Sequence, residues 1–122
     1  MIAVIFEVTP APGRKQEYLT LASQLRAQLE KLDGFISIER FASLADQGKM
    51  LSLSFWRDEE AVQKWRELED HRIAQSRGRN GIFADYRLRV ATVLRDYGMF
   101  AREQAPQDSR DAHDAKDSVA QR

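Results

Sequence analysis

The spacing of apolar residues predicts the elements of the first half of the chain. Residues 2–8 alternate, with Ile2, Val4 and Phe6 on one face, as in a half-buried strand. Apolar residues between positions 14 and 32 recur three and four apart, which predicts an amphipathic helix that ends at Asp33-Gly34. Residues 35–44 and 50–56 alternate again, and a short connection at 45–48 predicts a hairpin between them. The alternation slips near Arg40, where we expect a bulge.

The second half predicts another helix and another strand. Asp58 suits the N-cap of a helix, but the apolar stripe weakens after Leu68, so we expect a kink or a division into two short helices near residues 69–71. A loop with two glycines follows at 77–81, and residues 82–97 alternate as one long strand. We expect one domain over residues 1–100 and a polar, disordered tail over residues 101–122.

This order, β-α-β-β-α-β, predicts an α+β, ferredoxin-like fold, in which both helices cover one face of a four-stranded antiparallel sheet. The other face carries apolar residues such as Ala3 and Ile5 beside charged residues such as Glu7 and Arg87. A mixed face of this kind and a long last strand favour packing against a second copy about a two-fold axis. We therefore expect a homodimer through the sheet face.

Composition excludes several classes of function. The chain has 19 basic and 19 acidic residues, so no net charge favours nucleic acid or an anionic membrane. Cysteine is absent, which excludes disulfides and thiolate catalysis and fits a cytoplasmic protein. No apolar run is long enough to span a membrane. One usable histidine with scattered carboxylates does not make a metal site.

That histidine, His71, is the main candidate for proton chemistry. The only other histidine, His113, lies in the expected tail. An unperturbed imidazole titrates near about pH 6.5 and can act as a general base. The simpler alternative is a helix-end histidine that pairs with Glu69 and Asp70. Trp65 is likewise either a core residue or a pocket wall.

Four segments carry a resemblance to a known family. They are residues 34–37 after the first helix, residues 53–59 entering the second helix, Trp65 with His71-Arg72, and the end of the last strand at 90–97. On these segments the chain resembles the antibiotic biosynthesis monooxygenase family, whose members are dimeric α+β barrels. The resemblance implies a homodimer with facing sheets and a pocket between the sheet and the helices of each subunit.

The resemblance also implies an activity and a site. Some members oxidise aromatic phenols or quinols with O2 and no cofactor, so we expect a cofactor-independent monooxygenase of this kind. A phenolate gives an electron to O2 more readily than a phenol does, which suits a general base. The expected catalytic residues are His71, Arg72 and Tyr86, with Arg87 as another candidate to stabilise the anion. The expected substrate-binding residues are Phe6, Leu53, Phe55, Trp65 and Leu68.

Other functions stay open. The same pocket could serve a non-enzymatic binding or stress-response module, or a cofactorless isomerase or decarboxylase. Family members that degrade haem have an asparagine on the first strand and a histidine about ten residues after the helical tryptophan. This chain has Phe6-Glu7 and Gln75 there, so we expect no haem and no other cofactor.

Overall fold

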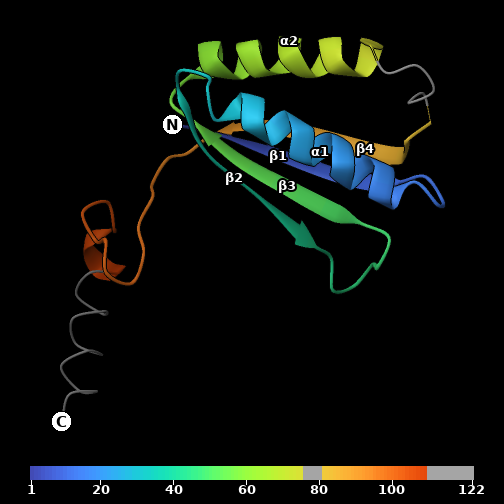
Figure 1. The fold of residues 1–122 in the computed structure, drawn as a ribbon. Coiled ribbons are helices and arrows are strands. Elements are labelled where there is room, and N and C mark those ends of the chain that lie inside the picture. The colour runs from blue at the N-terminus through green and yellow to red at the C-terminus, as the bar shows by residue number, and fades with distance from the viewer. Residues whose placement is uncertain (76–80, 110–122) are drawn as a thin grey trace. The chain divides into compact units, whose positions relative to one another are not determined.

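The computed structural model describes residues 1–75 and 81–109, and of residues 69–75 it describes the backbone alone (Figure 1). Its elements are β1 (Ile2–Pro10), α1 (Lys15–Leu29), β2 (Phe35–Ala42), β3 (Met50–Trp56), α2 (Glu59–Gln75) and β4 (Phe83–Thr92). The four strands form one antiparallel sheet in the order β2-β3-β1-β4, and both helices cover the same face. The predicted ferredoxin-like α+β fold is confirmed.

All six elements belong to one compact unit, Met1–Thr92. Its core lies between the sheet and the helices, where the largest fully buried side chains are Val4, Val8, Leu29, Trp56 and Ile82. Residues from Val93 onward form a second unit. Within it, the Arg102 guanidinium donates to the carbonyl oxygen of Gly98 at 3.1 Å and lies 5.3 Å from the ring centre of Tyr97. Positions 110–122 are outside the described residues, so the disordered tail stays a prediction.

The last strand is shorter than expected. β4 ends at Thr92, whereas the alternation predicted a strand that reaches Tyr97. The register gives the reason: Thr92 pairs with Ile2, the first residue of β1, and the ladder between the two strands ends at this pair.

Two other local expectations are wrong. The irregularity in β2 lies between Phe35 and Ser37 and not near Arg40, which leaves Ile36 52% exposed while Ile38 is buried. The expected break in the second helix is also absent, because α2 is a single helix over Glu59–Gln75. A weak apolar stripe therefore does not interrupt the helix, because the backbone hydrogen bonds of a helix do not require apolar side chains.

The start of α2 is fixed by a cap. The Ala61 backbone N–H donates to Asp58 Oδ1 at 2.9 Å, which confirms the predicted N-cap. This bond, with a second from Arg57, holds the pKa of Asp58 below its usual value. Arg57 also donates to both carboxylate oxygens of Asp33, at 3.1 and 3.0 Å, and so connects the α1–β2 loop to the start of α2.

Among the described helices, none is long and apolar enough to cross a membrane.

Gly34 allows this close approach, and a substitution there is expected to destabilise the fold. Its φ is +90°, and an added Cβ would lie 2.7 Å from the Cβ of Ala61. Gly34→Ala should lower the free energy of unfolding by about 1–3 kcal/mol, measured by urea denaturation. Gly13→Ala is the matched control, because Gly13 has φ +76° but nothing within 4 Å of the added Cβ. Equal losses in the two variants would show that the contact with Ala61 does not matter.

Candidate functional site

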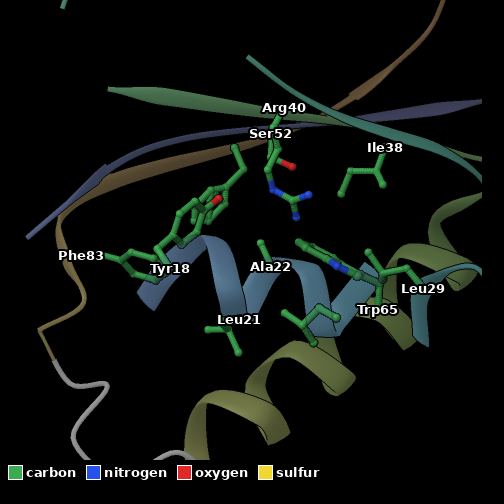
Figure 2. Close-up of a pocket in the computed structure, with 11 residues that line it drawn as sticks. Tyr18, Leu21, Ala22, Leu29, Ile38, Arg40, Ser52, Trp65 and Phe83 are labelled. Carbon is green, nitrogen blue, oxygen red and sulfur yellow. The ribbon is translucent and has the colours of Figure 1, made fainter. Parts of the chain in front are cut away.

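A mostly apolar cavity lies between α1, α2 and the sheet (Figure 2). The volume that the centres of water molecules can occupy in it is about 40 Å³. That space holds water but no ring, since a cavity of about 150 Å³ is the size that binds benzene. Its lining residues are Phe6, Tyr18, Leu21, Ala22, Leu25, Leu29, Ile38, Arg40, Ser52, Trp65 and Phe83.

The sheet register explains which side chains reach the cavity. Ser52 of β3 stands opposite Phe6 on one side and opposite Arg40 on the other, so the three residues form one row across β1, β3 and β2. Directly opposed residues share a face of the sheet. Because Phe6 faces the helices, Ser52 and Arg40 face them too. Ser52 and, on α1, Ala22 contribute small side chains to the lining.

Arg40 is the charged residue among the described residues that line this cavity. Figure 2 shows its side chain extending from the sheet toward Ala22 and Trp65. Its Nε atom is buried and has no hydrogen-bond partner. Sequence reasoning missed Arg40 as a site residue, although its position two residues after the inward-facing Ile38 was a usable signal.

Trp65 is both a core residue and a cavity wall. It is 8% exposed, its ring centre lies 6.0 Å from that of Trp56, and it lines the cavity. Trp56 is fully buried, and its Nε1 donates to Ser54 Oγ at 2.9 Å. The two alternatives considered for Trp65 are therefore both true of its position in the fold.

Aromatic rings close the other end of the cavity. The ring of Phe6 stacks on Tyr86, with centres 5.6 Å apart and planes at 24°, and meets Phe83 edge-on at 5.8 Å. Tyr18 meets Phe83 at 5.7 Å. Tyr86 is opposite Val8 in the register and so faces the helices, but it is 60% exposed and does not line the cavity. Tyr86 therefore supports the wall through Phe6 from outside.

Two of the expected substrate-binding residues lie elsewhere. Leu53 and Phe55 stand opposite Ile5 and Ala3, on the sheet face away from the helices. The expectation that they complete the cavity with Phe6 is wrong, because residues of β3 alternate and Ser52 takes the inward position. Leu68 is half-buried but does not line the cavity.

His71 and Arg72 are positions of α2 whose side chains lie outside the described part of the structure. Their expected catalytic roles stay predictions. Arg87 is opposite Glu7, on the face away from the helices, and so is not at the cavity.

Comparison with known proteins identifies a matching family and a similar curated protein. The model of a family described as antibiotic biosynthesis monooxygenase matches residues 1–77. A protein of Pyricularia oryzae named jasmonate monooxygenase ABM is 50% identical over 93 residues, which is 76% of this chain and 43% of that protein. The chain spans about half the length of the curated relatives it matches.

Solved structures share the fold at low identity. The structure of Rv0793 from Mycobacterium tuberculosis has a TM-score of 0.67 at 16% identity, covering 80% of this chain and 98% of that one. SnoaB, a cofactor-independent oxygenase from Streptomyces nogalater, has a TM-score of 0.63 at 9% identity, covering 78% of this chain and 94% of its own. At these identities the two structures support the fold alone.

Proposed function

The chain belongs to the antibiotic biosynthesis monooxygenase family, and from this premise we propose that it is a monooxygenase that transfers oxygen from O2 to a small ring compound bound between α1 and the sheet. The observation that supports this site is the apolar cavity lined by Phe6, Leu25 and Trp65, with few polar atoms. Ligand sites of enzymes commonly combine an apolar wall with a small number of placed polar groups.

The cavity must widen to admit a ring. The space of about 40 Å³ is too small for one, so side chains have to move when substrate binds. Arg40 is the longest flexible side chain in the lining, and Trp65 is held by its contact with Trp56. We therefore propose that Arg40 moves and that Trp65 stays in place as a fixed wall.

Two substrate classes fit the proposal. An aromatic phenol or quinol, predicted from the family resemblance, can be oxidised to a quinone while the second oxygen atom of O2 leaves as water. All the electrons then come from the substrate, and no cofactor is needed. An alicyclic acid is favoured by the relative named for jasmonate. Hydroxylation of such a compound consumes two electrons from an external reductant. The need for a reductant therefore distinguishes the two substrate classes.

Oxygen uptake tests the proposed function directly. Wild-type protein is assayed with hydroquinones without reductant and with jasmonate in the presence and absence of ascorbate, using isotopically labelled O2 and mass spectrometry. We expect label in the product of at least one class, with or without a chelator. Ala22→Leu should abolish uptake, because it fills the cavity, whereas Ala27→Leu on the exposed face of the same helix should not.

Absence of uptake across the whole panel would contradict the monooxygenase and favour a binding module. An isomerised or decarboxylated product without label would instead favour the cofactorless isomerase or decarboxylase.

We also propose that the protein is a cytoplasmic homodimer that pairs through the sheet face opposite the helices. Apolar Leu51, Leu53 and Phe55 lie there, and each is only half-buried in one chain. Glu7 on the same face accepts a hydrogen bond from Arg89 at 2.7 Å, so its charge is already paired. A mass of one chain in sedimentation equilibrium would contradict the dimer.

A further inference from the structure

We propose that Arg40 binds a carboxylate of the substrate and so selects acids over neutral ring compounds. This inference rests on the proposed function in one respect: the cavity between α1 and the sheet is taken as the substrate site. Arg40 is then a specificity-determining residue: the apolar part of the pocket holds the ring, and Arg40 recognises the carboxylate.

The first support is that the Arg40 side chain has a buried donor without an acceptor. Its Nε atom is buried and has no hydrogen-bond partner. Within the described part of the chain, the Arg40 side chain takes part in no hydrogen bond and no ion pair. A guanidinium carries N–H donors and no acceptor of its own, so it depends on an acceptor from outside the side chain. A buried donor attached to a charge is unfavourable until an acceptor reaches it.

The second support is the charge of the surroundings. None of the described residues that line the cavity is acidic, so the lining supplies no counterion. The acids that pair with arginines elsewhere in the same unit are already engaged. Glu7 is bound by Arg89 on the opposite face of the sheet, and Asp33 is bound by Arg57 beyond the end of α1. None of the described acids therefore pairs with Arg40, and we take the anion that pairs with it to come from a ligand.

The third support is the match between geometry and ligand. Guanidinium presents parallel N–H donors that suit the two oxygens of a carboxylate, and such charge-assisted bonds are strong. The apolar neighbours Phe6, Ile38 and Trp65 offer contact to a hydrocarbon ring but no acceptor for a charged donor. A compact ring that carries a carboxylate on a short arm meets both requirements, whereas a neutral ring leaves Arg40 unpaired.

Binding calorimetry with two probes of the same ring tests this role. The probes are cyclopentylacetate and its methyl ester, which differ in the charged group. Wild-type protein should bind the acid more tightly than the ester. Arg40→Met, which keeps the length of the side chain, should weaken binding of the acid about 10- to 100-fold and leave the ester unchanged. The affinity of Arg40→Lys for the acid should lie between those of the wild type and Arg40→Met, because lysine keeps the charge but lacks the paired N–H donors of a guanidinium.

Arg66→Gln is the matched control, since Arg66 is exposed on α2 and the change in net charge is the same. It should bind both probes as the wild type does. Equal weakening of acid binding by Arg66→Gln and Arg40→Met would overturn the proposal, as would a wild type that prefers the ester or binds neither probe. Thermal unfolding of Arg40→Met checks that the fold is retained.

The result is separable from that of the oxygen assay. Selective loss of acid binding in Arg40→Met without labelled product from the wild type would support Arg40 as an anion anchor and reject the monooxygenase. Labelled product from neutral phenols, with identical acid binding in Arg40→Met and wild type, would do the reverse.

Discussion

Trp56→Ala should lower the free energy of unfolding by about 3–5 kcal/mol, the range for removing a large aromatic side chain from a core. Trp56 is 0% exposed, and its ring meets Phe35 edge-on at 5.2 Å and Trp65 at 6.0 Å. It lies where β3 ends and thus joins the sheet to α2. The loss would also leave Ser54 Oγ, now an acceptor for the indole N–H, without this donor. Urea denaturation followed by far-ultraviolet circular dichroism measures the change.

Two further variants separate the causes of this loss. Trp56→Phe keeps an aromatic ring but removes the hydrogen bond, so it should lose less than alanine does. Ile36→Ala is the control for a large apolar residue on the sheet, because Ile36 is 52% exposed, and its effect should stay within about 0.5 kcal/mol. A loss below about 1 kcal/mol in Trp56→Ala would contradict the packing around this residue.

His71→Ala should reduce turnover of an accepted phenol by about 10²- to 10⁴-fold, the usual contribution of a general base. The reason is chemical: apart from His113, the chain has no other imidazole, and it has no cysteine. The measurement is steady-state oxygen uptake at several substrate concentrations, so that the turnover number and the Michaelis constant are separated. Added imidazole should restore part of the activity if the lost group is a base.

His113→Ala is the matched control and should leave uptake unchanged. Unchanged turnover in His71→Ala would reject the base assignment, and the helix-end alternative would then stand. A loss seen only in the Michaelis constant would instead indicate a role in binding.

The sequence predicted the order of the elements because each has a clear period. Alternation in β1 and the three-four spacing of α1 follow directly from burial of one face. The end of β4 could not be predicted in this way, since alternation continues past Thr92 and only pairing with Ile2 decides where the strand stops. Strand length is a property of two neighbouring segments, whereas periodicity belongs to one.

The cavity was predicted only in part. Phe6 and Trp65 are lining residues as expected, because each is apolar on an inward stripe. Leu53 and Phe55 were wrongly expected at the cavity, because alternation alone does not decide which side of β3 faces the helices. The structure instead turns Ser52 inward, and its small side chain lines the cavity. Arg40 was not predicted as a lining residue, since a charged residue on a strand is usually exposed to solvent.

The contact between Trp56 and Trp65 gives the protein a built-in optical reporter. These are the two tryptophans of the chain, both are buried, and one of them lines the cavity. With ring centres 6.0 Å apart, the indoles are close enough to share excitation energy, so their emission acts as one signal. Tryptophan emission should therefore change when a ligand enters the cavity. Ligands can then be screened by intrinsic fluorescence, without a dye or an added label.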